Sequence, residues 1–167
     1  MTTLSPGQLL TFPARPLVLA ARTASDLAAV RRVRETVFGD EQQMMDSTAT
    51  DPDDARSLHA LALLTLDGEQ VPVSTGRLTP DYGEGGEALI AWVATLPAYR
   101  GRGIGSAVIR FLLRSADSTR VPLVVLSAQA HAIDFYERLG FVTFGRRYTI
   151  RGIEHQWMAR HRPPGAP

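Results

Sequence analysis

The 167-residue sequence contains no cysteine, no lysine and no asparagine. Without cysteine, the chain can form neither disulfides nor zinc–thiolate sites, and it has no thiol nucleophile. Its 18 basic residues are all arginines, and they balance 17 acidic residues to a formal net charge of +1. With 44% hydrophobic residues and so little net charge, the composition excludes an intrinsically disordered chain and favours a folded domain.

Long hydrophobic runs are also lacking. The apolar stretches, such as residues 60–64 and 121–126, are far shorter than the roughly 20 residues that a membrane helix needs. Residues 1–16 have neither the basic start nor the apolar core of a signal peptide. We therefore predict a cytoplasmic protein without a membrane partner. It would have a flexible extension at residues 1–16, a single domain at residues 17–161 and a disordered tail at residues 162–167.

Apolar periodicity and turn residues divide the chain into alternating elements. A hairpin precedes a strand–helix alternation, which predicts an α/β (α+β) fold with helices on both faces of one sheet. A polar loop, or a short helix and a loop, is predicted at residues 39–56. Helices are predicted over the stripe from Leu27 to Val37, over residues 104–116 and over residues 130–139. Strands are predicted at residues 17–22, 57–66, 71–78, 88–95, 122–127, 141–147 and 153–161.

Glycines and arginines crowd the segment between the strand at residues 88–95 and the following helix. Gly101, Gly103 and Gly105 let the main chain approach a ligand closely, and the first amides of a helix lack intrahelical partners. With the positive end of the helix and with nearby arginines, these glycines predict a phosphate-binding turn. From the glycines alone, a turn that serves only the bend between strand and helix is an equal alternative.

Two common phosphate-binding motifs do not fit this segment. A nucleoside-triphosphatase P-loop needs a lysine, which the chain lacks. A dinucleotide fingerprint needs a third glycine where Ser106 stands, and a carboxylate about 20 residues further on, where Val121 and Pro122 lie. The ligand is therefore expected to be another phosphate compound.

Two motifs together resemble those of the GNAT superfamily of acyl-CoA-dependent N-acetyltransferases. The first runs from Arg100 to Gly105 as Arg-x-x-Gly-x-Gly, and follows a buried strand. The second runs from Ala132 to Phe141 as Ala-x-x-Phe-Tyr-x-x-x-Gly-Phe. The resemblance extends over residues 17–158 and implies a mixed, mostly antiparallel central sheet that splays open for coenzyme A.

This resemblance implies that the co-substrate is acetyl-CoA. It implies that main-chain groups of Val93, Ala94 and Thr95 pair with the pantetheine arm. Where many members of the superfamily carry asparagine, this chain has Gln129, whose amide is expected to contact the pantetheine. The pyrophosphate would be held by the turn and the start of the helix, at Arg100, Gly101, Arg102, Gly103, Ile104, Gly105 and Ser106. The four histidines have no metal-ligand spacing, so no metal is expected.

Acetyl transfer from a thioester to an amine needs an uncharged amine, an oxyanion donor and a proton for the departing thiolate. The resemblance implies that Tyr136 supplies this proton, although the residue pattern alone also suits a core tyrosine. The oxyanion donor would be a main-chain amide near Val93. Glu41, Glu87 and an ordered water are the candidate bases, and Glu41 is the preferred one.

Acidic side chains are concentrated at residues 39–56, which hold six of them against one arginine. Such a loop suits a solvated surface, or it could attract a cationic amine. The segment Val-Phe-x-x-Glu-Gln that ends at Gln42, with the acids and histidine that follow, resembles the ElaA-like subgroup. We expect Glu41, Asp54 and His59 to bind the acceptor, as a small amine, an amino acid or a polyamine-like molecule.

The sequence thus predicts an N-acetyltransferase that works by direct attack in a ternary complex, since no cysteine can carry the acyl group. Three alternatives stay open: transfer of a longer acyl chain, acetylation of protein N-termini, and a non-catalytic CoA-binding regulatory domain. A nucleic-acid partner is not expected, because the isoelectric point is only about 8.3 and no aromatic residues interleave the arginine-rich segment. Edge strands near the C-terminus suit a homodimer.

Overall fold

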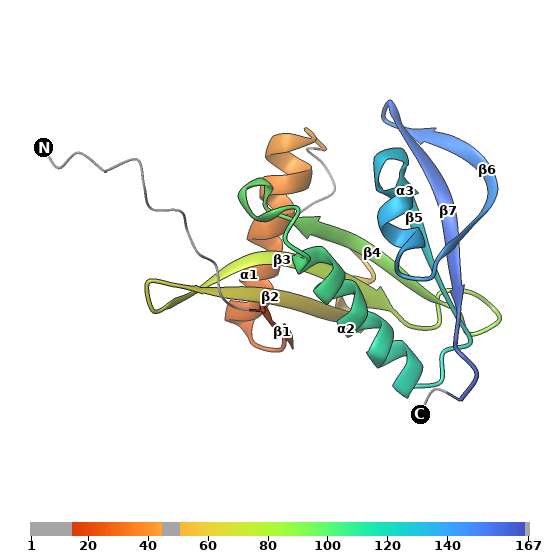
Figure 1. The fold of residues 1–167 in the computed structure, drawn as a ribbon, viewed down its shortest axis with the longest axis horizontal. Coiled ribbons are helices and arrows are strands. Elements are labelled where there is room, and N and C mark those ends of the chain that lie inside the picture. The colour runs from red at the N-terminus through yellow and green to blue at the C-terminus, as the bar shows by residue number, and fades with distance from the viewer. Residues whose placement is uncertain (1–14, 45–50, 166–167) are drawn as a thin grey trace, which may run out of the picture.

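The computed structural model describes residues 15–44 and 51–165, and its strands form one seven-stranded sheet (Figure 1). The strand order is β1-β2-β3-β4-β5-β7-β6, and every neighbouring pair is antiparallel except β4–β5. The predicted mixed, mostly antiparallel sheet is therefore confirmed. The strands are β1 (Leu17–Ala20), β2 (Leu58–Leu66), β3 (Glu69–Thr79), β4 (Ala88–Thr95), β5 (Leu123–Gln129), β6 (Val142–Ile150) and β7 (Ile153–His161).

Helices cover both faces of this sheet, as predicted. One face carries α1, which packs on β1 and β2 through Val30 and Leu61, and the other carries α2 and α3 (Figure 1). The α-helices are α1 (Ala24–Arg34), α2 (Ile104–Ser118) and α3 (Ile133–Glu137). Shorter turns are the π-helix η1 (Glu35–Glu41) and the 3₁₀ turns η2 (Asp54–Arg56), η3 (Pro97–Tyr99) and η4 (Ala130–Ala132).

Local start and stop signals explain several of these boundaries. Thr23 and Asp26 form the predicted capping box at the start of α1, since the Asp26 amide donates to Thr23 Oγ1 and the Thr23 amide donates to Asp26 Oδ2. The β2–β3 hairpin turns at Asp67-Gly68, where both φ angles are positive (50° and 85°). Gly140 ends the last helical turn with a φ of 88°.

The predicted helices differ from the observed ones at two places. The helix expected to end at Val37 continues through η1, where the Gln42 amide donates to the Val37 carbonyl five residues back. The helix expected at residues 130–139 is a 3₁₀ turn followed by the five-residue α3. Part of the predicted polar loop, including Asp46, lies outside the described residues.

The main core lies between the sheet and α2. Ile104, Val108 and Leu112 lie one turn apart along α2 and are buried, as the apolar spacing predicts, whereas Phe111 is half-buried. Gly76 lets this helix approach β3 closely, because a Cβ there would lie 3.0 Å from Val108 Cγ1. This packing fixes the start of α2 against the end of β4.

The predicted ends of the domain are only partly described. The extension expected at residues 1–16 lies outside the described residues up to residue 14. Arg162, where the tail is expected to begin, is anchored, since its amide donates to the Pro122 carbonyl and its Nε to the Asp117 carbonyl. Within the described residues, no helix has the length and hydropathy to span a membrane.

Candidate active site

The turn between β4 and α2 has the backbone that its glycines predict. Gly101 and Gly103 have φ angles of 73° and 75°, which side-chain-bearing residues rarely adopt. Gly103 is the N-cap of α2 and offers no side-chain acceptor, so the first amides of this fifteen-residue helix point into the turn without an intrahelical acceptor. The turn therefore forms a site suited to a phosphate group.

The residues of this turn that the sequence predicts to bind the cofactor differ in the groups that they can present to a ligand. Ile104 is buried in the core, so it can offer only its main chain. Ser106 is half-buried in the first turn of α2, and Arg102 is exposed in the turn. A Cβ on Gly105 would lie 3.4 Å from Thr95 Oγ1 and 3.6 Å from the Phe135 ring, so this glycine holds α2 close to β4 and α3.

The two central strands separate next to this turn (Figure 1). Their parallel pairing spans only Ala88↔Val124 to Ile90↔Leu126, although β4 continues to Thr95 and β5 to Gln129. We call the unpaired ends of the two strands the divergence. The main-chain groups that these ends turn toward each other are not used by the sheet, and an extended ligand arm can pair with such groups. The splayed sheet implied by the sequence resemblance is confirmed.

Strand register decides which β4 residues face the divergence. The Leu96 amide donates to the Val73 carbonyl of β3, and in an antiparallel pair successive residues alternate between facing the partner and facing away. Val93 and Thr95 therefore turn their main-chain groups toward β5. Ala94 turns toward β3, and its carbonyl accepts from Ser74 Oγ at 2.8 Å. Of the three predicted pantetheine partners, two face the divergence.

A β-bulge interrupts β4 just before these residues. The register shifts between Thr75 and Arg77 of β3, and Trp92 has a φ of 55°. The bulge turns the indole toward the α1 side of the sheet, where it meets Phe38 of η1 edge-to-face at 5.2 Å and donates from Nε1 to Asp51 Oδ2 at 2.8 Å. The bulge thus changes the direction of β4 next to Val93, where the sequence predicts the oxyanion amide.

Arg100 links the phosphate-binding turn to η1. Its Nη1 and Nη2 donate to Glu41 Oε1 and Oε2 at 2.8 and 2.6 Å, and its Nε donates to the Thr95 carbonyl at 2.9 Å. The hydrogen bonds from Arg100 lower the pKa of the Glu41 carboxyl, and the same contact raises the pKa of Arg100. Glu41 is consequently a weaker proton acceptor than an ordinary glutamate, which disfavours it as the general base.

Gln129 lies at the end of β5, across the divergence from Val93. Its Nε2 donates to Gln42 Oε1 at 3.0 Å. Together with the Glu41–Arg100 pair, this contact holds the end of η1 beside the ends of both central strands. The other candidate base, Glu87, lies at the opposite end of β4, where Oε2 accepts from the Gly85 amide and so holds the β3–β4 turn.

Tyr136 lies in α3 on the α2 side of the sheet. It is 8% exposed and meets Phe135 and Phe141 edge-to-face, with centroid distances of 4.9 and 5.9 Å. Burial raises the pKa of its phenol, so the hydroxyl stays protonated at neutral pH. A protonated hydroxyl is the form that a hydrogen-bond or proton donor needs.

Two arginines are buried on the α1 side of the sheet, in what we call the arginine cluster. Arg34 is 1% exposed and donates from Nη1 to both carboxylate oxygens of Asp54 at 3.1 and 3.0 Å. Arg77 is 2% exposed, and its Nη1 lies 2.7 Å from Asp51 Oδ1 and 2.9 Å from Asp54 Oδ1. The cluster therefore ties the segment before β2 to α1 and β3.

His59 belongs to the arginine cluster. Its Nδ1 lies 3.0 Å from Arg34 Nη2, and because arginine can only donate, Nδ1 must accept. Its Nε2 therefore carries the hydrogen, and it donates to the Asp54 carbonyl at 2.9 Å. Burial lowers the pKa of His59, in agreement with a neutral ring. Both ring nitrogens of His59 have protein partners. His59 would therefore position the segment before β2 and would not bind the acceptor through its ring nitrogens.

Most acids of the acidic segment are thus paired with arginines. Asp51 and Asp54 pair with the two buried arginines, and Glu41 pairs with Arg100. Asp53 pairs with Arg56 at 2.8 Å. Of the five acids described at residues 39–56, four are therefore paired with arginines, and the fifth, Asp40, is exposed.

Comparisons with known proteins agree with this geometry. The family model for the Acetyltransferase (GNAT) family matches residues 27–141. The chain belongs to the GNAT family of acetyltransferases, and it is an acyltransferase. A Bacillus subtilis protein named as a candidate acetyltransferase is 30% identical over 81% of this chain and 89% of its own length.

Two solved structures extend the likeness to the whole fold. Escherichia coli ElaA superposes with a TM-score of 0.75 at 25% identity, over 88% of this chain and 100% of its own. An acyl-CoA N-acyltransferase from Pseudomonas aeruginosa gives a TM-score of 0.71 at 28% identity, over 88% and 99%. The GNAT assignment from the two sequence motifs is therefore confirmed.

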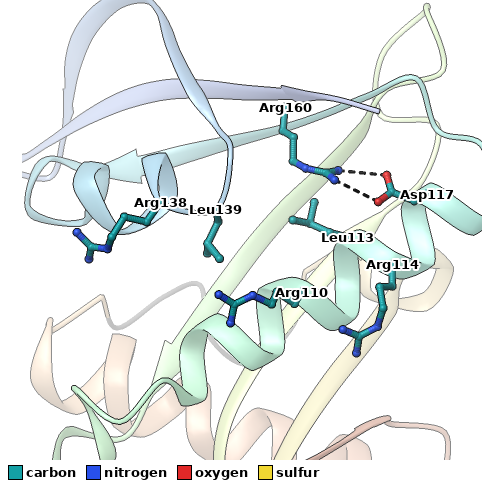
Figure 2. A pocket seen from close by; sticks show the side chains of 7 residues that line it. All are labelled: Arg110, Leu113, Arg114, Asp117, Arg138, Leu139 and Arg160. Atoms are coloured by element: carbon teal, nitrogen blue, oxygen red, sulfur yellow. Dashed lines mark hydrogen bonds and ion pairs between the residues drawn. The ribbon is translucent and has the colours of Figure 1, made fainter. Parts of the chain in front are cut away.

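This GNAT protein also has a basic pocket between α2, the end of α3 and β7 (Figure 2). Leu113 and Leu139 lie at its centre, and the Asp117 carboxylate pairs with Arg160 through Oδ1 and Oδ2 at 3.1 and 3.2 Å. The residues that line it carry four arginines against one acid: Arg110, Leu113, Arg114, Asp117, Arg138, Leu139 and Arg160.

Sequence reasoning did not find the arginine cluster, the bulge or the basic pocket. One feature of the sequence could have predicted the cluster. Arg34 falls on the inward-facing stripe that Val30, Val33 and Val37 define. An arginine on such a stripe needs buried acidic partners. For a metal there is no sign: among residues 15–44 and 51–165, no group of three or more histidines or acids is arranged to hold an ion.

Proposed function

We propose that this protein transfers the acetyl group of acetyl-CoA to a primary amine by direct attack in a ternary complex. The divergence of β4 and β5, which ends at the phosphate-binding turn, carries this proposal. The amine nitrogen attacks the thioester carbonyl, so a C–N bond forms, the C–S bond breaks and coenzyme A leaves as a thiolate. The chain has no cysteine for a covalent acyl intermediate, which supports direct attack.

The cofactor would lie along three features of the fold. Main-chain groups of Val93 and Thr95 would pair with the pantetheine arm, with Gln129 on the opposite strand. The amides from Gly101 to Ser106 would hold the pyrophosphate. The basic pocket lies further along α2, and its arginines would take the remaining phosphate of coenzyme A. Arg100, whose guanidinium donates to Glu41 and Thr95, would position the turn.

Tyr136 would donate to the departing thiolate. Because burial raises its pKa, the phenol is a weak acid, and it would act mainly by a hydrogen bond to the sulfur as negative charge develops there. The Val93 amide, just after the bulge, would stabilise the oxyanion. Glu41 would position Arg100 instead of taking the amine proton, and Asp54 and His59 would hold the loop that borders the acceptor.

A thiol-release assay with acetyl-CoA tests the proposal across small amines, polyamines and N-terminal peptides. We expect release with at least one small primary amine, and none with water alone. Release with peptides only would favour N-terminal acetylation, and faster release from a longer acyl-CoA would favour a longer chain. Tight CoA binding with no release from any amine would overturn the proposal in favour of a regulatory CoA-binding domain.

A further inference from the structure

A group of aromatic side chains lies on the sheet face opposite α2 and α3. On β7, Met158 is buried in the main core with Tyr136, so the alternate residues His155 and Trp157 point to the other face. Register pairs them with Tyr148 and Phe144 of β6. Ring centroids lie 5.8 Å apart for Tyr148–His155, 6.2 Å for Tyr148–Trp157 and 6.4 Å for Phe144–Trp157. We call these four residues the aromatic wall.

The wall adjoins the divergence. Trp157 pairs with Ser127 and His155 pairs with Gln129 of β5, both just beyond Leu126 in the last β4–β5 pair. Ser127 Oγ is also hydrogen-bonded to the Tyr148 hydroxyl. In the last β4–β5 pair, Ile90 lies opposite Leu126. Val93 lies three residues beyond Ile90 on β4, and Gln129 lies three residues beyond Leu126 on β5. The wall therefore stands at the level of the proposed oxyanion amide.

β4, the other strand of the divergence, also carries a tryptophan on the α1 face of the sheet. Trp92 of β4 is turned toward α1 by the bulge, and packs on Phe38. The chain has two tryptophans, so each arm carries one of them on the α1 side. Coenzyme A would approach from the side of α2, which leaves the α1 side for the second substrate.

Charge on this side does not suit a polycation. Glu41 and Asp54 are paired with arginines, so the segment that the sequence shows as acidic offers little unpaired negative charge. The wall does offer one acceptor for an amine. His155 Nδ1 lies 2.8 Å from the Ile153 carbonyl, which can only accept, so Nδ1 carries the hydrogen and Nε2 of the neutral ring is an acceptor.

We propose that the acceptor is a primary amine bearing a flat aromatic group. This group would stack on Trp157 and Tyr148, and His155 Nε2 would accept the proton that the amine loses as its C–N bond forms. The thiolate released from the thioester accepts a hydrogen bond from Tyr136 and is protonated by water, and His155 gives up its proton to water. This inference rests on the proposed acetyl transfer and names its substrate class.

Single-tryptophan variants test where the acceptor binds. Trp92→Phe leaves only Trp157, and Trp157→Phe leaves only Trp92. With coenzyme A bound, titration with 2-phenylethylamine is expected to change the emission of Trp157 saturably, whereas spermidine leaves it unchanged. An unchanged Trp157 signal at amine concentrations that saturate thiol release would overturn the proposal.

Kinetics with acetyl-CoA test the substrate class. We expect kcat/KM for 2-phenylethylamine to exceed that for spermidine by about tenfold, the size of a favourable aromatic contact. Trp157→Leu should raise the KM for 2-phenylethylamine by a similar factor and leave CoA binding unchanged. The control Val142→Ala removes an apolar side chain from the same hairpin face, level with Val125 where the central strands are still paired, and should change nothing.

The outcomes separate this inference from the proposed function. Absence of CoA binding and of thiol release with every amine would overturn the proposed function. Efficient turnover of spermidine, with no effect of Trp157→Leu, would overturn only the aromatic acceptor. A dimeric mass that Trp157→Leu converts to monomer would also overturn it, because the wall would then be covered by a second copy. For His155, a His155→Gln variant should lower kcat for 2-phenylethylamine and leave CoA binding unchanged, and an unchanged kcat would overturn its role as the proton acceptor.

Discussion

The two faces of the divergence are built in different ways. On the α2 side, the phosphate-binding turn and Tyr136 come from two contiguous motifs, each shorter than a dozen residues. On the α1 side, the arginine cluster and the aromatic wall combine side chains from α1, the segment before β2, and β2, β3, β6 and β7. The α2 side is therefore a local backbone arrangement, whereas the α1 side depends on tertiary packing.

This contrast predicts that substitutions on one face leave the function of the other intact. Tyr136→Phe should give the largest effect on rate. Removal of the hydroxyl is expected to lower kcat about 100-fold, the low end for a positioned proton donor, with unchanged CoA affinity. Stopped-flow thiol release and CoA calorimetry measure the two quantities. Tyr82→Phe, at an exposed tyrosine in the β3–β4 turn, is the matched control. An equal loss in both variants would remove the acid role.

Asp54→Asn should weaken the acceptor side and the fold together. The substitution leaves Arg34 and Arg77 buried with one carboxylate fewer, which costs about 2 kcal/mol of unfolding free energy after allowance for the partial exposure of Asp54. Urea unfolding measures this, and Asp40→Asn at an exposed site serves as the control. The amine KM should rise while CoA affinity in the folded variant is retained. A loss of CoA affinity would contradict the prediction that the two faces function independently.

Lowering the pH should reduce the free energy of unfolding through the arginine cluster on the α1 side. Burial by itself raises the pKa of Asp54, but hydrogen bonds from Arg77 and charge from Arg34 outweigh it and hold that pKa below its ordinary value of 3.8. A lowered carboxyl pKa stabilises the fold above 3.8, and this stabilisation is lost as pH falls through the folded-state pKa. Unfolding monitored from pH 6 to about 2 should therefore show a steeper loss for the wild type than for Asp54→Asn. Parallel curves would contradict this assignment.

Glu41→Gln should have the smallest effect. The Glu41–Arg100 pair is about two-fifths exposed on both sides, so its loss is worth at most about 1 kcal/mol. We expect a rise of a few-fold in the KM for acetyl-CoA, diminished at high salt, and an unchanged pH–rate profile. Glu154→Gln, which removes a comparable exposed pair with Arg147, is the control. Loss of the acidic limb of the profile in Glu41→Gln would restore Glu41 as the base.

The sequence predicted the backbone of the phosphate-binding turn and its flanking elements well because the signals are local. The bounds of β4 and β7 match the predicted strands, and Gly103 lies at the predicted start of α2. A positive φ that only glycine tolerates, and a helix start that follows a strand, are both visible in neighbouring residues. The same reasoning holds for the capping box at Thr23.

The packing on the α1 side was predicted less well, for a physical reason. The acids before β2 looked unpaired because their partners, Arg34 and Arg77, lie about 20 residues away in either direction. Trp92 looked like an ordinary strand residue, whereas the bulge alters the alternation of faces along β4. The contacts of Trp157 depend on which strand lies beside β5, and that is a property of the fold.

The most direct test of the account is the binding of acetyl-CoA measured by calorimetry for the wild type, Gly103→Asp and Gly68→Asp. Both glycines have positive φ (75° and 85°) and open space beside them, so the two substitutions carry a similar backbone cost. Only Gly103 lies in the phosphate-binding turn. The account predicts binding by the wild type and by Gly68→Asp, and its loss in Gly103→Asp. Equal binding by all three proteins would contradict it.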